Sequence, residues 1–399
     1  MTVEQKAILE VLAFSLGKKK TDLCLDKLDM NKLFEEAKLQ SVLPSVFDGL
    51  DKLGFAQFDN LELTILYEQM IANNLRILAE HESIEKLMSE AKIPYCILKG
   101  AASAKYYPEP YLRSMGDVDF YVSHEDIKKA SQLMIEHGYA TVDHKSDIHM
   151  TFRKGTSVVE AHDCINGIPE AEAGKIIGKW CESIIDDSVE YDSDFGKCRV
   201  PCDFHHGIII LLHMLHHLVA NGIGLRHLCD WAAFVNTFEA DSFAEMFEQK
   251  LTQVGLWHSA QLLSLTCVKY LSTEYEKWMG EDNEGFCDGL MEDILTGGNF
   301  GRKDEVHSHS SLFTSSYGRD GKSQSWFSSG ISAINAKTYT AHPFIKKHKI
   351  FLPIGWLLFL CEYIRRRFGK KKKVPSISKA VKRSNERRSL LNKLELYKL

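Results

Sequence analysis

The sequence predicts an α+β fold, in which a mixed core of strands and helices lies between two helical regions. Three observations support this prediction. Apolar residues recur at helical spacing up to about residue 90, short alternating runs fall between residues 91 and 168, and helical spacing returns from residue 169. With 399 residues, 44% of them hydrophobic and 26% charged, the chain has the composition of a globular protein of two or three packed units.

Residues 1–90 form the first predicted region, which we expect to be helical. Apolar residues in its second half, such as Leu63, Leu66 and Met70, recur near helical spacing. We find no pattern of reactive side chains in this region.

Residues 91–168 form the predicted α+β core, because the apolar period changes there from helical to alternating. The strand at 94–98 ends at Lys99 and Gly100 and opens into the small residues 101–104, which indicates a strand, turn and helix unit. Further strands are expected at 117–122, 139–142, 149–152 and 157–162, with a helix at 125–137.

Residues 169–296 form a predicted helical domain, followed by two regions of different character. Residues 297–345 are rich in Gly, Ser and Asn and are predicted to be largely loop, and residues 346–399 hold an apolar segment and a basic tail. Within the helical domain, helices are expected at 204–220, 225–238, 242–254 and 256–270.

The last region differs from the rest of the chain in charge. The formal net charge is −5, but residues 346–399 carry about 17 Lys and Arg against 3 Glu. The apolar run at 350–364 is shorter than the roughly 20 residues of a spanning helix, so we expect no membrane crossing. Residues 346–373 have the composition of a segment that docks at an anionic membrane surface. A core helix followed by a solvated basic tail is an equally good interpretation. Binding of RNA phosphates by the basic residues is a third.

We expect a cytoplasmic protein, which would contact the inner face of the membrane peripherally if this tail docks there. The sequence begins without the basic and apolar regions of a secretory signal. The 10 cysteines are scattered without a CxxC pair, which is typical of reduced thiols, and we assign them no chemical role.

Two carboxylates, Asp117 and Asp119, give the clearest chemical signal. At positions i and i+2 of a strand they project from one face, where they could hold Mg²⁺ or Mn²⁺ together with a triphosphate. A third carboxylate completes a two-metal site, and Glu160, which alternation places on one face with His162, is the candidate, with Asp163 as its rival. A turn with solvated acids is the competing interpretation of the pair alone.

The residues near this pair suit a phosphate group. Lys99 and Gly100 precede a predicted helix start that includes Ser103, so backbone N–H groups there could bind phosphate oxygens. Lys99 and Arg113 add positive charge beside the acids. For each of these two residues, an ordinary surface cation is the alternative interpretation.

Histidines gather on the predicted helix 204–220, where His213 and His217 lie four residues apart. We do not predict a zinc site, because no Glu lies between them as in zinc proteases and the helix is otherwise apolar. We expect structural or nucleotide-facing histidines instead. His217 and Arg226 would line a cleft between the core and the helical domain, and an i to i+4 ion pair of Arg226 with Asp230 is an equally plausible alternative.

The sequence also contains an ordered series of short motifs: 97–100 (ILKG), 107–108 (YP), 113–122 (RSMGDVDFYV), 138–139 (GY), 159–162 (VEAH), 222–231 (GIGLRHLCDW) and 297–301 (GGNFG). In this series it resembles the uncharacterised bacterial nucleotidyltransferase family of the polymerase-beta-like superfamily, over roughly residues 60–360. The resemblance implies a polymerase-beta-like core in which Asp117 and Asp119 bind metal and Glu160 is the third acidic position. Lys99 and Gly100 replace the glycine-serine turn of better-known relatives.

The resemblance further implies transfer of a nucleotidyl group from an NTP to an acceptor hydroxyl. The acceptor is unidentified among a sugar, a lipid head group, a protein and RNA, and RNA is not favoured because the body of the chain is acidic. The alternative is a non-catalytic module that binds a nucleotide or a partner at the membrane, near envelope-polysaccharide machinery, where such family members are often found. We prefer the enzyme, because all three carboxylates are present.

Overall fold

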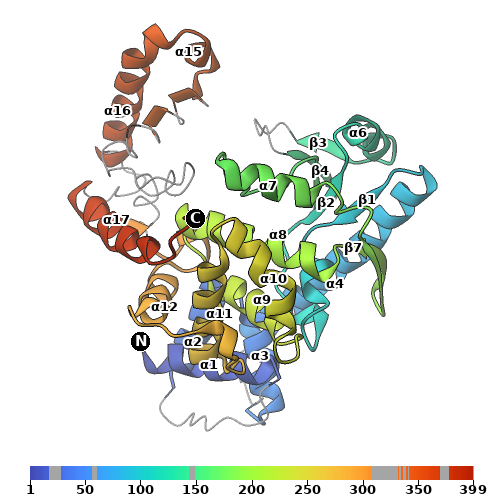
Figure 1. The fold of residues 1–399 in the computed structure, drawn as a ribbon, viewed down its shortest axis with the longest axis vertical. Helices are drawn as coiled ribbons and strands as arrows, with labels where there is room; N and C mark the ends of the chain where they lie inside the picture. The colour runs from blue at the N-terminus through green and yellow to red at the C-terminus, as the bar shows by residue number, and fades with distance from the viewer. Residues whose placement is uncertain are drawn as a thin grey trace.

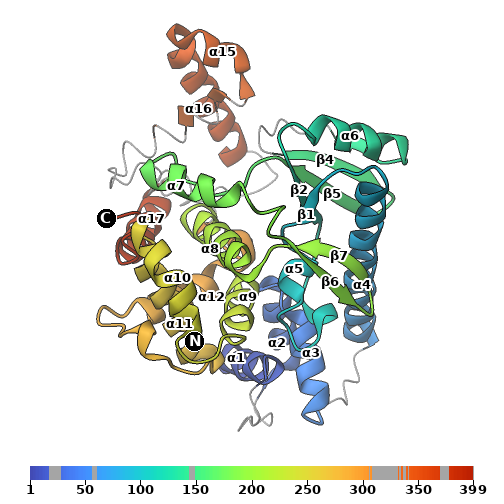
Figure 2. The ribbon, with the colours of Figure 1, turned by 45° about the vertical axis from the view of Figure 1, so that its right-hand side comes forward.

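The computed structural model has a mixed α+β fold, which confirms the predicted fold class (Figure 1). A five-stranded sheet lies on one side of the molecule, and a body of helices lies on the other (Figure 2). The structure describes residues 1–17, 28–55, 61–142, 149–304, 306–307, 331, 334–335, 338–339, 341–368 and 377–398.

The sheet has the strand order β1-β2-β5-β4-β3. At its centre β2 runs parallel to β5, and the other neighbouring strands are antiparallel. Each strand coincides with a predicted one, because alternating apolar residues mark strands that are buried on one face. The strands are β1 (Tyr95–Ile97), β2 (Val118–Val122), β3 (Ala140–Val142), β4 (His149–Lys154) and β5 (Ser157–His162).

Two helices pack on the sheet, α4 (Leu61–Glu90) and α6 (Ile127–Glu136). Ile84 of α4 and Met134 of α6 belong to the same buried apolar cluster as Phe120 of β2. Burial of these side chains supplies the main stabilisation of the sheet, at about 1.5–3 kcal/mol for each large apolar residue.

A hairpin of β6 (Val189–Ser193) and β7 (Gly196–Val200) lies within residues 169–296, where the sequence pattern predicts mostly helix. Cys198 of β7 is buried in the apolar cluster of the sheet, and the Arg199 amide donates a hydrogen bond of 3.0 Å to the Tyr95 hydroxyl. The hairpin therefore extends the packing of the sheet region. Its strands are short and largely polar, so their alternation is weak in the sequence.

The helical body combines segments from both halves of the chain. Its apolar cluster includes residues of α1, α2 and α3 as well as those of α8 to α12, whereas α4 contributes to the cluster of the sheet. The predicted N-terminal helical region is thus helical but divides between two cores. The helices are α1 (Val3–Ser15), α2 (Met30–Leu39), α3 (Leu43–Lys52), α7 (Glu172–Cys181), α8 (Asp203–Val219), α9 (Leu225–Val235), α10 (Ser242–Gln253), α11 (Trp257–Leu271) and α12 (Phe286–Gly297).

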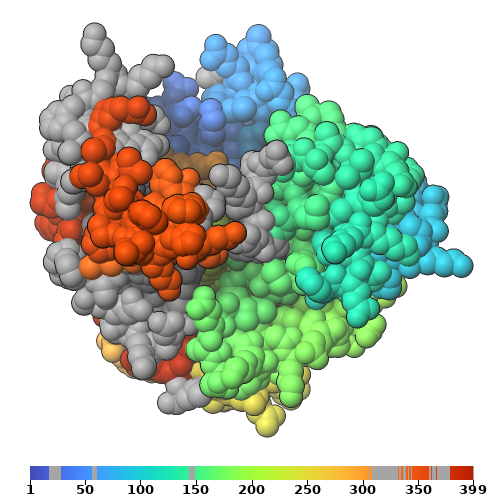
Figure 3. Space-filling model, turned by 90° about the horizontal axis from the view of Figure 1, so that it is seen from above, coloured from blue at the N-terminus to red at the C-terminus, as the bar shows by residue number. Residues whose placement is uncertain are grey.

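The C-terminal region contains helices with different surroundings. α15 (Pro343–Lys347) and α16 (Leu352–Phe368) project from the body, and in a view from above they lie opposite the sheet region (Figure 3). α17 (Ile377–Asn392) packs against the body, where the buried Arg387 donates a hydrogen bond of 2.6 Å to the Leu218 carbonyl of α8.

The sequence predictions for the C-terminal half concern membrane crossing, a loop region and a basic run. Among the described residues, no helix combines the length and apolar character that a membrane crossing requires. Much of the predicted loop region 297–345, and the basic run at 369–376, lie outside the described residues.

Candidate active site

The parallel pairing of β2 and β5 brings three carboxylates together. Asp119 is the register partner of Glu160, and side chains at paired positions of neighbouring strands project from the same face. Asp117 comes directly before β2, where the charges of Asp119 and Glu160 act on its carboxylate. We call Asp117, Asp119 and Glu160 the carboxylate wall.

Asp119 is buried and held between the side chains of Lys99 and His162. Its Oδ2 lies 3.0 Å from Lys99 Nζ, and its Oδ1 lies 2.8 Å from His162 Nε2. Burial alone would raise the pKa of Asp119, but Lys99 and His162 outweigh that effect and hold this pKa below its usual value. The Leu98 amide donates to the Asp119 carbonyl at 2.9 Å, which keeps the end of β1, and hence Lys99, beside the carboxylate.

The pKa of Asp117 is shifted in the opposite direction, above its usual value. The Asp117 side chain is exposed, but the partial loss of its hydration among its neighbours and the negative charges of Asp119 and Glu160 raise the pKa of Asp117 to about 6. The positive charges of Lys99 and Arg226 offset only part of this effect. A divalent cation would relieve this repulsion, and carboxylate oxygens are the donors that Mg²⁺ and Mn²⁺ prefer. The carboxylate wall therefore offers donor atoms of the type that such an ion takes, although its three side chains do not form one of the closely spaced ligand groups among the described residues.

Glu160, and not its rival Asp163, is paired with Asp119. Asp163 lies beyond the end of β5, and its Oδ2 is 2.6 Å from Nδ1 of the exposed His124. Glu160 instead contacts two histidines, with Oε1 3.4 Å from His149 Nε2 and Oε2 3.6 Å from His162 Nε2. Alternation along β5 indicated His162, but only the register with β4 reveals His149.

Gly100 forms the turn between β1 and the short helix α5 (Ala101–Ala104). Its φ of 60° lies in the left-handed region that favours glycine, and a Cβ there would approach His81 Nε2 to 2.5 Å. Burial lowers the pKa of His81 to about 4, so this ring is neutral. Ser103 of α5 is buried, and its hydroxyl has no hydrogen-bond partner among the described residues.

Arg113 joins the core to the helical body. Its Nε and Nη2 donate hydrogen bonds of 2.7 and 2.8 Å to the two carboxylate oxygens of Asp230, and the Tyr107 hydroxyl donates to the same carboxylate at 2.7 Å. Asp230 thus pairs with Arg113, and the alternative of an ion pair within α9 between Arg226 and Asp230 is wrong. A planar guanidinium held bidentately in a buried place fixes orientation, so this pair aligns α9 with the loop before β2.

His217 and Arg226 lie on the helical side of the site, where they meet the ring of Phe300. Its centroid is 4.7 Å from that of His217 and 5.6 Å from Arg226 Cζ. Arg226 Nη1 donates to the Ser114 carbonyl at 3.5 Å, and its charge lowers the pKa of Asp117. We call His217, Arg226 and Phe300 the helical wall.

The side chains of the helical wall combine charge, an aromatic face and neutral imidazole. Burial, with smaller contributions from His216, Lys99 and Arg226, lowers the pKa of His217 to about 3, so its ring is uncharged at neutral pH. The hydrogen bond from Arg226 to the Ser114 carbonyl, three residues before Asp117, brings the helical wall next to the carboxylate wall.

The helical wall depends on contacts between distant segments. The buried Gln40 accepts a hydrogen bond of 3.1 Å from the Leu225 amide through Oε1, which fixes the start of α9. Asn299 donates to the Ser41 hydroxyl at 2.7 Å and thereby fixes η3 (Asn299–Gly301), which carries Phe300. A Cβ on Gly224 would approach Asn299 Cα to 2.9 Å, so the two glycine motifs at 222–231 and 297–301 meet at a point where only glycine fits.

Two other histidines of α8, His205 and His206, have structural surroundings, whereas His213 packs against His217 with ring centroids 4.4 Å apart. His205 Nε2 lies 2.8 Å from the Trp180 carbonyl oxygen, and His206 packs between Tyr106 and Phe234 at centroid distances of 4.8 and 5.5 Å. Among the described residues, the group spaced to hold a metal ion is His149, Glu160 and His162, which lies in the sheet rather than on α8.

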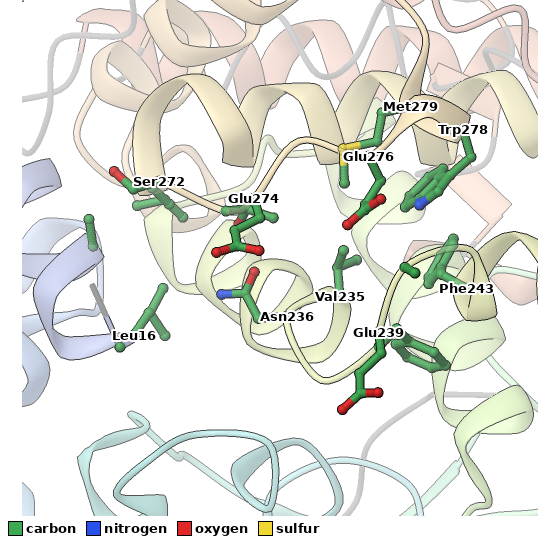
Figure 4. A pocket seen from close by; sticks show the side chains of 16 residues that line it. Leu16, Val235, Asn236, Glu239, Phe243, Ser272, Glu274, Glu276, Trp278 and Met279 are labelled. Atoms are coloured by element: carbon green, nitrogen blue, oxygen red, sulfur yellow. The ribbon is translucent and has the colours of Figure 1, made fainter. Parts of the chain in front are cut away.

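A pocket of about 730 Å³ lies elsewhere in the helical body (Figure 4). Its lining includes the apolar side chains of Val235, Phe243 and Trp278 and the acidic side chains of Glu274 and Glu276. The described residues that line it include none of the predicted site residues, so we do not connect this pocket with the carboxylate wall.

The comparisons with known proteins were informative at the level of the family. None of the curated proteins matches this chain. An antigenic nucleotidyltransferase-like protein from Paracoccidioides brasiliensis is similar in structure, with a TM-score of 0.32 and 14% identity over 50% of this chain and 94% of that protein.

The model of one family, described as uncharacterised nucleotidyltransferase, matches residues 26–272. The matched residues include every member of the carboxylate wall and of the helical wall except Phe300. Phe300 and its motif at 297–301 lie after the end of the match. Because the match spans more than half of the sequence, the chain belongs to the uncharacterised nucleotidyltransferase family.

Proposed function

We propose that this protein is a divalent-cation-dependent nucleotidyltransferase that transfers an NMP group from an NTP to an acceptor hydroxyl. The observation that carries the proposal is the register pairing of Asp119 with Glu160, beside Asp117 and next to Lys99. Carboxylates gathered on parallel strands, with a lysine in contact, are suited to a metal-bound triphosphate. Membership of a nucleotidyltransferase family supports the same reaction class.

In this proposal the acceptor oxygen attacks the α-phosphorus, a new P–O bond forms, and the bond from the α-phosphorus to the bridging oxygen breaks to release pyrophosphate. Asp117, Asp119 and Glu160 would hold Mg²⁺ or Mn²⁺, which when bound offsets the charge that develops on the phosphoryl oxygens. Glu160 completes this set or accepts the proton of the attacking hydroxyl.

The remaining site residues would position the nucleotide. Lys99, 3.0 Å from Asp119, places a positive charge beside the carboxylate wall, and the Gly100 backbone and the Ser103 hydroxyl would steady phosphate oxygens. Arg226 would contribute charge from the opposite side. The predicted contribution of Arg113 to triphosphate binding would act through charge alone, because its guanidinium is engaged by Asp230.

We propose that the reaction takes place in the cytoplasm, where NTPs are available, on an acceptor that is a sugar, a lipid head group or a protein rather than RNA. The nine described cysteines are free thiols, which suits a reducing compartment. The acidic body of the chain disfavours an RNA acceptor.

The proposal is tested by pyrophosphate release from each of the four NTPs with Mg²⁺ or Mn²⁺, with and without cell extract. Wild type is compared with the Asp117→Ala, Asp119→Ala double variant, and Asp163→Ala serves as a matched acidic control because Asp163 pairs with His124. We expect release by wild type and control, and at least about a 10³-fold loss in the double variant. Equal release by all three would contradict the proposal.

A second candidate is a non-catalytic nucleotide- or partner-binding module at an anionic membrane surface near envelope-polysaccharide machinery. The surface of α15 and α16 favours membrane contact, because residues 343–358 include no acidic residue and place exposed lysines beside exposed apolar side chains. The exposed apolar residues are Phe344, Ile350, Phe351, Ile354, Trp356, Leu357 and Leu358, and the exposed lysines are Lys346, Lys347 and Lys349.

Membrane contact is tested by co-sedimentation with vesicles that contain phosphatidylserine and with neutral phosphatidylcholine vesicles. We expect binding to the anionic vesicles alone, and its loss when Ile354 and Leu357 are both replaced by Ser. Equal recovery with both vesicle types, or no effect of the replacement, would exclude this surface. A protein that binds nucleotide and vesicles but releases no pyrophosphate would favour the second candidate over the enzyme.

A further inference from the structure

Two histidines share Glu160 with the carboxylate wall. One ring nitrogen of His149, one ring nitrogen of His162 and one Glu160 carboxylate oxygen all lie within 4.8 Å of one another. The sheet fixes this arrangement, because Glu160 and His162 lie at i and i+2 of β5, and His149 of β4 is the register partner of His162. The cluster is therefore built into the core and does not depend on a flexible loop.

The spacing of these atoms matches a coordination shell. Glu160 oxygens lie 3.4 Å from His149 Nε2 and 3.6 Å from His162 Nε2. In a tetrahedral site with bonds of about 2.0–2.1 Å, neighbouring ligand atoms are roughly 3.3 Å apart. Small movements of the side chains would bring these three donors to one ion, and the proton that His162 Nε2 shares with Asp119 Oδ1 would be released as the ion binds.

The chemistry of the donors selects a class of ion. Mg²⁺ takes oxygen ligands and is rarely bound by imidazole, whereas Mn²⁺, Fe²⁺, Co²⁺ and Zn²⁺ accept a set of two imidazoles and one carboxylate. Three protein ligands leave coordination positions open, as in catalytic rather than structural metal sites. Asp119 Oδ1, 2.8 Å from His162 Nε2, lies at the border of the cluster and the carboxylate wall.

We propose that His149, Glu160 and His162 form a binding site for a divalent transition-metal ion, adjacent to the oxygen-only site of Asp117 and Asp119. The inference deepens the proposed function, because Glu160 would serve both sites and the protein would use a mixed pair of ions rather than two Mg²⁺. Metal binding itself requires neither nucleotide nor acceptor, so it is measured separately from catalysis.

The test is a Co²⁺ titration of the chelator-treated full-length protein, followed by visible absorption. Co²⁺ bound by imidazole in a four- or five-coordinate site absorbs much more strongly than hydrated Co²⁺. We expect one equivalent of such Co²⁺ in wild type, not displaced by a large excess of Mg²⁺. His149→Ala is the main variant, because the His149 side chain is 23% exposed and its truncation leaves the core of the sheet intact.

We expect His149→Ala to weaken Co²⁺ binding by at least about 100-fold, since loss of even an outer-shell partner costs 10–100-fold. His124→Ala, which removes an exposed histidine paired with Asp163, is the control and keeps wild-type binding. Circular dichroism verifies that each variant is folded. An unchanged spectrum in folded His149→Ala, or displacement of Co²⁺ by Mg²⁺, would overturn the inference while leaving the proposed nucleotidyl transfer intact. Imidazole-bound Co²⁺ in a protein that releases no pyrophosphate would retain the metal site and reject the transfer reaction.

Discussion

The two walls of the candidate site are built in different ways. The carboxylate wall comes from neighbouring parallel strands, and the register of Asp119 with Glu160 fixes it. The helical wall joins α8, α9 and η3, and it depends on contacts such as Gln40 with Leu225 and Asn299 with Ser41. Strand geometry thus specifies the acids locally, whereas the cationic and aromatic groups require the whole tertiary structure. We expect perturbation of the first wall to remove chemistry, and perturbation of the second to change affinity.

The largest expected effect concerns the link between the walls. Arg113→Ala would leave the buried Asp230 without its bidentate partner, and breaking a buried ion pair costs about 3–5 kcal/mol. We expect urea denaturation to show a loss of this size in the free energy of unfolding. Replacing Arg113 by Met together with Asp230 by Leu should recover much of it, and a folded Arg113→Ala protein of wild-type stability would show that the link is unimportant.

The next effect separates Glu160 from its rival. Glu160→Gln retains the volume of the side chain but removes its charge from the carboxylate wall, and we expect kcat to fall about 10²–10³-fold. Asp163→Asn is the matched control and should retain wild-type kcat, because Asp163 contacts His124 and not the wall. Steady-state pyrophosphate release measures both. The reverse pattern would assign the third acidic position to Asp163.

A smaller effect should appear in the pH dependence of stability. Burial lowers the pKa of His206 below its unfolded value, so the unfolded chain binds the additional proton as the pH falls below about 6.5. Stability is therefore present above that pH and declines towards pH 5, by about 1.4 kcal/mol per pH unit for such a group. We expect thermal unfolding of His206→Phe to depend less steeply on pH between 7 and 5. The exposed His137, replaced by Ala, should leave the slope unchanged, and equal slopes in all three proteins would contradict the assignment.

The smallest effect tests the helical wall. Gly224→Ala would force the Asn299 backbone away by its added Cβ and displace Phe300, although no side chain of the wall is removed. We expect the KM for the NTP to rise about tenfold, equivalent to about 1.4 kcal/mol, with little change in kcat. Gly178→Ala in α7, whose Cβ would meet open space, is the control. A Gly224→Ala protein with unchanged KM would remove Phe300 from the account of nucleotide binding.

The difference between local strand patterns and long-range contacts also explains which parts of the fold and of the candidate site the sequence predicts. The strands and the acidic residues on them follow from alternation along each strand, which short-range sequence patterns record. The pairing of β5 with both β2 and β4 is a property of the sheet, so the proximity of His149 to Glu160 has no local signal. The β6–β7 hairpin was not expected, because its short polar strands carry a weak pattern.

Contacts between segments far apart in the sequence also determine the partners of individual residues. Spacing along one helix offered Arg226 as an equally plausible partner of Asp230, but in the structure Arg113 of the core binds both Asp230 carboxylate oxygens. Phe300 and Gln40 lie far from α9 in the sequence and near it in space. Phe300 lies in the motif 297–301, but neither that motif nor any pattern around Gln40 indicates a contact with α9.

The central claim is the transfer of a nucleotidyl group, and the position of a radioactive phosphate tests it most directly. Protein, cell extract and a divalent cation are incubated with the preferred NTP labelled at either the α- or the γ-phosphate. We predict that the α-label becomes attached to an acceptor and the γ-label is released as pyrophosphate, in both cases only with intact Asp117 and Asp119. Attachment of the γ-label to the acceptor would identify phosphoryl transfer instead and would contradict the proposed reaction.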